Sequence, residues 1–436
     1  MELLERFTYY SIRALMVLYL TNRLHYSDHT AVAIFSYFSA VAYMTPLLGG
    51  YVADTYLGKY RTILLFSVVY FVGSASLSVS AIWELRWGAF LGLGLIAIGT
   101  GGIKPCVSAF GAEQTRDEEV GSYFRLFYLV INVGSLFSYV CTPLARKYVS
   151  YWFAFGLSTI GLAAALALFY SARRKYHIRE PSGSVLSQMT RIMCNACRSR
   201  RAGTHLEPGM SDGDRVHWLD WAKFTNSTRE VDDTKAVLRV LPVFACLPVF
   251  WALFDQQGST WTLQADRLDL YGLEPEQLGV LNPLFVMVFI PLVDRIILPV
   301  MHRCPSRLKP TPLRRMSVGM FVTAASFVAA AFLQDRINKS EPNSVSVLAM
   351  LPQYAIITFG EVLVSTTGLE WSFTEAPSSL KGVIMAAYLL TNSIGDLTAG
   401  LLFTALHKLS RVQIFVTFAG LMCLSALVFI GVAIWY

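Results

Sequence analysis

Charged side chains stand in the first apolar segment of the chain, where they could bind protons or charged ligands. The polar members of this segment are Glu2, Glu5, Arg6, Tyr9, Tyr10 and Arg13. At 100° per residue, all of them except Tyr10 fall within an arc of roughly 100°, which predicts one polar stripe facing away from lipid. Water at a chain end would also accommodate Glu2 and Glu5. It does not explain Arg13, which precedes the apolar run 14–20.

Single ionisable residues interrupt later apolar segments as well. They are Lys104, Arg239, Asp255, Asp294 and Glu361. Ionisable groups inside a membrane are costly and usually functional. Acids and bases occur in both halves of the chain, so ion pairs across a central cavity can form. Such pairs add little stability, but they suit a switch, because protonation or a zwitterionic ligand breaks them. A purely structural role is the alternative.

Polar and aromatic residues recur at helical spacing beside these charges. Tyr128 and Asn132 are four residues apart, Tyr354 and Glu361 are seven apart, and Asn282 opens a further apolar segment. Arg and Lys bind carboxylates, and acids with amide oxygens bind ammonium groups. Aromatic rings form tolerant pockets, and buried acids can carry protons. The set therefore predicts a ligand with an ammonium at one end and a carboxylate at the other.

The elements that position these residues are long apolar segments. The chain has 436 residues, of which 54% are hydrophobic and 15% charged, and its mean hydropathy is +0.49. About 20 apolar residues span a bilayer as a helix, which predicts an all-α membrane protein. The predicted helices are 1–21, 30–52, 62–83, 87–110, 122–143, 152–171, 237–257, 278–302, 314–334, 346–370, 380–406 and 412–436.

The twelve segments divide into two sets of six. Residues 1–171 predict an N-terminal six-helix bundle, residues 172–235 a cytoplasmic linker with a possible amphipathic helix, and residues 236–436 a C-terminal six-helix bundle. Two bundles around a central cavity are typical of transporters. Excess Lys and Arg mark the cytoplasmic side. They cluster in the linker, as at Arg179, and before the ninth helix, at Arg303, Arg307 and Lys309.

The same rule accounts for the net charge of +7, so we do not expect a nucleic-acid partner. Cys194 and Cys197 form a lone C-x-x-C without a second pair or a His, and we expect no metal site and no cofactor. Paired His residues, metal-ligand spacing and a nucleophile elbow are missing from the sequence. We therefore do not expect an enzyme.

Several motifs resemble those of proton-dependent oligopeptide transporters, eukaryotic branch, in the major facilitator superfamily. Residues 2–10 read E-L-L-E-R-F-T-Y-Y and resemble the E-x-x-E-R-F-x-Y-Y motif of that family. The other matching segments are Gly99–Pro105, Phe127–Ser135, His217–Trp221, Trp251–Gln257 and the loop residues Gly50, Asp54, Gly58, Lys59 and Arg61. The resemblance covers nearly the whole chain and implies a major facilitator fold and proton-coupled symport of di- and tripeptides.

The resemblance also implies roles for individual residues. Glu2, Glu5 and Arg6 would couple protons to substrate binding. Arg6 and Lys104 would bind the peptide carboxylate, and Glu361, Asn132 and Asn282 its amino terminus. Lys104 would pair with Glu361 when no peptide is bound, and Arg13–Asp255 and Arg239–Asp294 would be gating bridges. The pocket would be lined by Tyr9, Tyr10, Tyr43, Tyr128, Trp251 and Tyr354.

The chain departs from the family pattern at several points. Ser36 stands where animal plasma-membrane relatives carry a His, and Tyr388 where the family usually has a Trp. The 335–345 loop is too short for the extracellular domain of animal homologues. Relatives have about half a helix before the first motif, so we expect this sequence to be trimmed or incomplete.

Other functions remain open on the same fold. Nitrate, histidine or peptide-like metabolites could be the substrate, and a non-transporting nutrient sensor is a further alternative. Peptide is favoured because Lys104 and Glu361 offer anchors of opposite sign, whereas nitrate needs only a cation. The expected partners are small peptides and the lipid bilayer. We expect the plasma membrane rather than an endosomal or lysosomal membrane, and the sequence does not give the oligomeric state.

Overall fold

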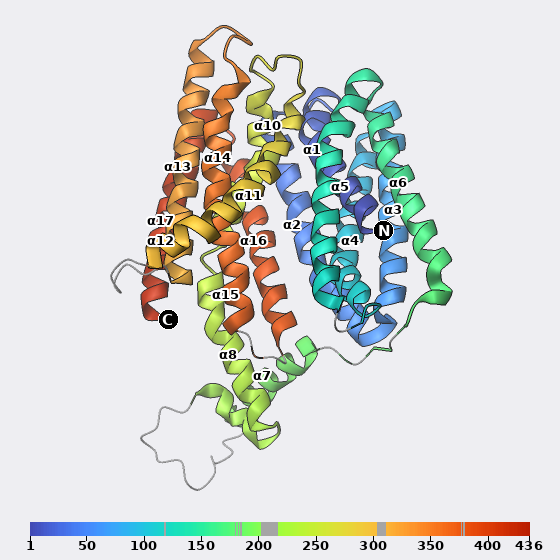
Figure 1. The fold of residues 1–436 in the computed structure, drawn as a ribbon, viewed down its shortest axis with the longest axis vertical. Coiled ribbons are helices and arrows are strands. Elements are labelled where there is room, and N and C mark those ends of the chain that lie inside the picture. The colour runs from blue at the N-terminus through green and yellow to red at the C-terminus, as the bar shows by residue number, and fades with distance from the viewer. Residues whose placement is uncertain are drawn as a thin grey trace.

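The computed structural model describes residues 1–436 except 117–118, 179, 182, 184, 202–216, 303–310, 376 and 378–379. Arg179, Arg303, Arg307 and Lys309, which contributed to the predicted orientation, lie outside the described residues. Within the described ranges the chain is helical, with one isolated bridge between Asp269 and Ser346 (Figure 1).

The first half folds as six helices that agree closely with the predicted segments. They are α1 (Glu2–Asn22), α2 (Asp28–Val52), α3 (Gly58–Trp83), α4 (Arg86–Ala112), α5 (Val120–Tyr148) and α6 (Tyr151–Ser171). A short π-helical turn, η1 (Ala53–Leu57), joins α2 to α3. Polar caps define two of the helix starts, because Ser27 Oγ accepts a hydrogen bond from the Thr30 amide and Ser150 Oγ accepts one from the Phe153 amide.

The linker contains η3 (Ala172–Lys175), α7 (Val185–Arg201) and η4 (Trp218–Phe224), and it lies at one end of the molecule (Figure 1). Ile192 and Ala196 of α7 are buried against Leu219 and Ala222 of η4. The basic residues Arg198, Arg200 and Arg201 are in the last turn of α7. One face of α7 is therefore apolar and packs on η4, and the end of the helix is basic.

Asp220 anchors η4 to the start of the second half. Its Oδ1 lies 2.5 Å from Lys235 Nζ and 2.9 Å from Lys223 Nζ, and its Oδ2 accepts a 3.0 Å hydrogen bond from the His217 amide. Burial acts to raise the pKa of Asp220, but the hydrogen bonds from Lys235 and Lys223 outweigh it and lower that pKa. Lys235 belongs to α8 (Thr228–Phe244), which begins eight residues earlier than the predicted C-terminal bundle.

The second half contains more interrupted helices than the first. After α8 its elements are α9 (Pro248–Phe254), η5 (Asp255–Gly258), α10 (Thr260–Ala265), η6 (Pro275–Val280), α11 (Leu281–Leu292), η7 (Val293–Ile297), α12 (Leu298–His302), α13 (Pro312–Lys339), η9 (Val347–Met350), α14 (Leu351–Glu361), η10 (Val362–Thr366), α15 (Thr367–Glu375), α16 (Lys381–Ala405) and α17 (Arg411–Trp435). The chain bends by 51° where α8 meets α9, at Pro248.

Eight helical segments in the described ranges are long and apolar enough to span a membrane, or nine with the bent segment that begins at α8. One of them, Asp28–Trp83, contains both α2 and α3. α1 is not among these segments, since Glu2, Glu5, Arg6 and Arg13 make it too charged. Each of the twelve predicted segments nevertheless contains a helix, and the protein is a multi-pass integral membrane protein.

Glycines let α2, α3 and α4 pack closely beside the polar end of α1. A Cβ added to Gly49 would lie 2.4 Å from the Gly102 carbonyl oxygen, and one added to Gly102 would lie 2.2 Å from Phe66 Cδ1. Both distances are shorter than atoms tolerate, so only glycine fits at these crossings. The Gly99–Pro105 motif therefore serves close packing around the helix that carries Lys104.

The two bundles contact each other at the end away from the linker. Arg146 near the end of α5 forms ion pairs with Glu274 and Glu276, in or just before η6; its Nε lies 2.9 Å from Glu276 Oε1. Asp28, which begins α2, pairs with Arg411, which begins α17. These helix ends lie opposite α7 (Figure 1). The structure is therefore closed at the end that faces away from the linker.

Candidate functional site

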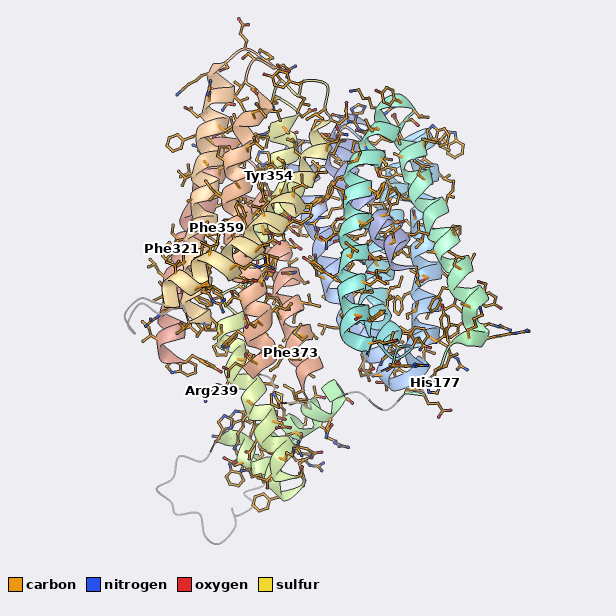
Figure 2. The ribbon with its side chains drawn as sticks, in the orientation of Figure 1. His177, Arg239, Phe321, Tyr354, Phe359 and Phe373 are labelled. Atoms are coloured by element: carbon orange, nitrogen blue, oxygen red, sulfur yellow. The ribbon has the colours of Figure 1, made fainter. Side chains whose placement is uncertain are left out.

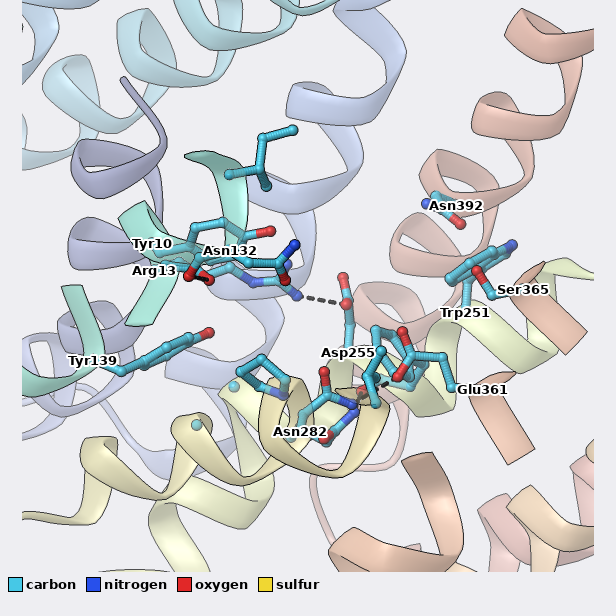
Figure 3. Close-up of a pocket in the computed structure, with 18 of the residues that line it drawn as sticks. Tyr10, Arg13, Asn132, Tyr139, Trp251, Asp255, Asn282, Glu361, Ser365 and Asn392 are labelled. Carbon is cyan, nitrogen blue, oxygen red and sulfur yellow. Dashed lines mark hydrogen bonds and ion pairs between the residues drawn. The ribbon is translucent and has the colours of Figure 1, made fainter. Parts of the chain in front are cut away.

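A cavity of about 380 Å³ lies between the two bundles (Figure 3). This volume is at the small end of the range for small-molecule sites. The first half lines it from α1, α2, α4 and α5, and the second half from α9, η5, α10, η6, α11, α14, η10, α15 and α16. Ten predicted site residues line it: Tyr10, Arg13, Tyr43, Lys104, Tyr128, Asn132, Trp251, Asp255, Asn282 and Glu361.

The cationic wall of the cavity contains Lys104. Its Nζ lies 4.0 Å from the ring centroid of Tyr43, close enough for a cation–π interaction. Within the described residues, Lys104 has no carboxylate oxygen within ion-pair distance of 4.0 Å. The predicted ion pair with Glu361 is therefore not formed, although both residues line the cavity. The sequence indicates that Lys104 and Glu361 belong to opposite bundles. It does not indicate how far apart the bundles stand, and that distance decides whether the two side chains pair.

The anionic wall contains Glu361, at the end of α14. Its Oε2 accepts a 2.7 Å hydrogen bond from Asn282 Nδ2, which also donates to Thr358 Oγ1 at 3.2 Å (Figure 3). A π-helical turn, η10, follows Glu361 directly. π-Helical turns often occur at functional sites, because the extra residue re-aims side chains. Asn282 thereby orients one carboxylate oxygen of Glu361 and leaves the other able to accept.

The cluster at the start of α1 is buried behind the cavity rather than on its wall. Arg6 Nε lies 2.5 Å from Glu5 Oε2 and 3.2 Å from Glu2 Oε1, and Thr100 Oγ1 donates to Glu5 Oε1 at 2.8 Å. Glu5 is 1% exposed, so placing it in water at the chain end is wrong. Arg6 is engaged by two acids and does not line the cavity. Tyr9, whose ring centroid lies 5.3 Å from the Arg6 guanidinium, does not line it either.

Arg13 and Asp255 form an ion pair across the cavity between the two bundles. Arg13 Nη2 lies 2.5 Å from Asp255 Oδ1, and the dashed contact is visible in Figure 3. The guanidinium also lies over the ring of Phe35, 5.1 Å from its centroid. Since Arg13 belongs to α1 and Asp255 to η5, this contact has to break for the halves to separate here.

The second predicted bridge, Arg239–Asp294, is not formed. Arg239 Nη2 donates to the Tyr436 carbonyl oxygen at 3.3 Å, and its guanidinium lies 5.0 Å from the centroid of the Tyr436 ring. Asp294 is exposed on η7. Figure 2 shows Arg239 near the linker end. Arg239 lies in α8 and Asp294 in η7, and Arg239 is engaged instead by Tyr436, the residue that follows α17.

Tyr354 was predicted to line the pocket, and this is wrong. It is 1% exposed and packs edge-to-face on Trp261 of α10, with centroids 5.0 Å apart. Figure 2 shows it toward the end away from the linker. Seven residues keep Tyr354 on the same helix face as Glu361, but they also separate the two by about 10 Å along the axis. The seven-residue spacing thus indicated the shared helix face of Tyr354 and Glu361, but not that Tyr354 lies too far along the helix to reach the cavity.

Sequence reasoning missed several residues that line the cavity. They include Ser135, Tyr139, Gln257, Ser365, Leu389 and Asn392. Ser135 and Tyr139 follow Asn132 at three and seven residues, so extending that stripe along α5 would have found them. Tyr388, noted as a departure, also lines the cavity, and its hydroxyl donates to the Ser365 carbonyl oxygen at 3.1 Å.

The fold and cavity define a class of protein: a two-bundle membrane transporter of the major facilitator fold. The family model described as the POT family matches residues 60–419. This chain therefore belongs to the POT family, a family of transporters rather than enzymes.

Known proteins agree with this assignment. Solute carrier family 15 member 1 of Oryctolagus cuniculus is 39% identical over 372 residues, which cover 78% of this chain and 52% of that protein. Peptide transporter family 1 of Drosophila melanogaster is 39% identical over 358 residues, covering 78% and 47%. The chain spans about half the length of these relatives. The solved structure of the POT family transporter PepTSo is similar with a TM-score of 0.89, at 31% identity, covering 100% of this chain and 96% of that one.

Proposed function

We propose that this chain carries out proton-coupled symport of di- and tripeptides by alternating access. The observation that supports this most strongly is that Lys104 and Glu361 line one cavity from opposite bundles without pairing with each other. A small peptide is a zwitterion whose carboxylate suits Lys104 and whose ammonium suits Glu361. Asn282 and Asn132 supply further amide oxygens beside the amino terminus.

The side walls suit a ligand with variable side chains. Tyr10, Tyr43, Tyr128 and Trp251 line the cavity, and Tyr139 adds a fifth aromatic ring. Aromatic rings offer large apolar surfaces together with polar edges, so they accept many side chains. Trp251 is held in place by a 3.0 Å hydrogen bond from its Nε1 to Thr391 Oγ1.

In this proposal the buried cluster of Glu2, Glu5 and Arg6 carries the coupling proton. Protonation of Glu5 would weaken its contact with Arg6, and the freed guanidinium would raise the positive potential at Lys104, which interacts with both residues. The peptide carboxylate would then bind more tightly. Arg6 acts here through Lys104 rather than by touching the substrate, which differs from the role that the resemblance implies.

Alternating access would break the ion pairs that join the bundles. Arg13–Asp255, the Arg146 cluster and Asp28–Arg411 join the two bundles in this structure. Opening the end away from the linker would require all three contacts to separate, while the linker end closes. Arg239 and Asp294 would form their bridge in another state of this cycle. We further propose the plasma membrane as the location, with peptides and lipid as the partners and protons as the coupling ion.

Counterflow tests the substrate class. Proteoliposomes are loaded with unlabelled Ala-Ala, and entry of labelled Ala-Ala is followed with nitrate, histidine or a second dipeptide outside. The proposal predicts competition by the dipeptide alone. Competition by nitrate or histidine at similar concentrations would favour those substrates instead, and no exchange by folded protein would favour a sensor.

A further inference from the structure

A buried carboxyl group of α16 has no donor to satisfy it. Asp396 is 1% exposed. In the part of the chain that the structure describes, neither Oδ1 nor Oδ2 of Asp396 accepts a hydrogen bond. A buried ionised carboxylate without hydrogen bonds or a paired cation is costly, by several kcal/mol. Asp396 therefore needs either an unseen donor or a proton of its own.

The neighbour of Asp396 is a second carboxyl group. Asp255 lies within hydrogen-bonding reach of Asp396, and Arg13 interacts with both. Four further titratable groups interact with Asp255 from the surrounding elements: Tyr9 of α1, Tyr43 of α2, Tyr139 of α5 and Glu361 of α14. Arg13 is already bound to Asp255 Oδ1 at 2.5 Å. One guanidinium therefore stands against two carboxyl groups that touch each other.

Charge balance decides how many protons this arrangement holds. With both carboxyls ionised, the cluster has a net charge of −1 in a buried place, and the two anions repel each other at contact. With one proton between them the cluster is neutral, and the proton supplies the missing hydrogen bond. Adjacent buried carboxyls commonly share a proton for this reason.

We propose that Asp396 is a proton-binding residue of this protein and donates a hydrogen bond to Asp255 while Asp255 is ion paired with Arg13. Asp396 belongs to neither the buried cluster of α1 nor the walls of the cavity. The use of its proton for coupling rests on the proposed function, whereas the presence of the proton does not.

Separation of the bundles would move Arg13 away from Asp255 and Asp396 and would expose both carboxyl groups to water. Asp255 and Asp396 both belong to the second half, and Arg13 to the first. If Asp396 loses its proton to water, two carboxylates face one guanidinium, and opening the closed end becomes more favourable because water reaches both anions. If Asp396 keeps its proton, the cluster of Arg13, Asp255 and Asp396 has no net charge, the Arg13–Asp255 ion pair persists, and the closed end is stabilised. Closure at this end thus depends on one proton.

Ser36 on α2 is a notable neighbour in this region. α2 and α16 are antiparallel, and Ser393 Oγ donates to the Ala40 carbonyl oxygen at 2.7 Å. Counting one turn in opposite directions from that contact places Asp396 level with Ser36. Ser36 is buried, and its hydroxyl brings no titratable group to this level of the bundle interface.

Infrared spectroscopy of the purified protein tests the proposal without requiring transport. A protonated carboxyl absorbs in a carbonyl region separate from that of a carboxylate. The spectrum of Asp396→Asn is subtracted from that of the unmodified protein at neutral pH. We expect a carboxylic-acid band with the intensity of about one group per molecule. Asp396→Glu keeps the carboxyl and should keep the band at a shifted frequency, which also provides a second, conservative variant.

Asp335→Asn is the matched control, since Asp335 on α13 is partly exposed and pairs with Lys339. Its difference spectrum should contain a carboxylate band and no carboxylic-acid band. Loss of a carboxylate band from Asp396→Asn, with no carboxylic-acid band, would overturn the proposal. Failure of the protein to accumulate peptides would overturn the proposed function while leaving the infrared result as it stands.

Discussion

Replacement of Glu361 by Gln tests the two-anchor description of the cavity. Gln has the same shape, and its amide oxygen can still accept the hydrogen bond that Asn282 Nδ2 donates to Glu361 at 2.7 Å. The change therefore removes the negative charge and leaves the local packing intact. We expect a dipeptide to lose its charge-assisted contact at the amino terminus and to keep its contact at Lys104.

The size of this loss can be estimated from the contact that is removed. A hydrogen bond to a charged group contributes about 1.5–3 kcal/mol. Every 1.4 kcal/mol corresponds to a factor of ten in affinity, so dipeptide binding should weaken roughly 10- to 150-fold. The same ligand without its amino group has no ammonium to bind Glu361. Its affinity for the Gln variant should change by less than about threefold.

Inhibition of counterflow measures both affinities in one assay. Unlabelled Ala-Ala and its des-amino analogue are titrated against labelled Ala-Ala, for the unmodified protein and for Glu361→Gln. Glu341→Gln is the matched control, because Glu341 is exposed in the loop after α13; it should change neither affinity. An equal loss for Ala-Ala and the des-amino analogue, or no loss for either, would refute the role of Glu361 as the ammonium anchor.

Three further predictions concern other parts of the molecule. Glu5→Gln should abolish uphill uptake driven by a proton gradient and spare counterflow; unchanged uphill uptake would remove Glu5 from the proton path. Gly102→Ala should lower the melting temperature of the purified protein, because its Cβ would meet Phe66 at 2.2 Å and overpacking costs about 1–3 kcal/mol. Gly94→Ala, with nothing within 4 Å of its Cβ, should leave it unchanged, and equal melting temperatures would contradict the packing argument. The lowered pKa of Asp220 means that its contribution to linker docking is present above the unfolded value of about 3.9 and is lost as pH falls through the folded value. Protection of residues 218–224 against hydrogen exchange, relative to an unstructured peptide at the same pH, should therefore stay high at neutral pH and fall below about pH 4; Asp220→Asn should lower this protection at neutral pH, and equal protection in that variant would contradict the anchoring role.

The positions of the helices could be predicted well because hydrophobic length is a local property. The six helices of the first half begin and end within a few residues of the predicted bounds. The second half was harder. The tenth predicted helix, 346–370, is divided into η9, α14, η10 and α15. A π-helical turn leaves little trace in hydropathy, because it inserts a residue without changing composition.

The sequence could predict which helix faces carry the residues of the candidate site, but it could not predict which of these residues form ion pairs. Arg13 and Asp255 are paired as the motifs implied, whereas Lys104 and Glu361 are not. Pairing depends on how far apart the bundles stand, which no spacing along the chain encodes. Asp396 also interrupts an apolar segment but was not among the predicted site residues, and its neighbour in the fold is a second acid, Asp255.

Uptake of a labelled dipeptide into proteoliposomes, with and without an inward proton gradient, tests the central claim most directly. The protein should be reconstituted with any residues that precede Met1 in the intact protein. We expect accumulation above the external concentration with the gradient, and equilibration alone without it or with a protonophore. Equal uptake in both conditions would contradict proton coupling, and no dipeptide uptake by demonstrably folded protein would contradict peptide transport.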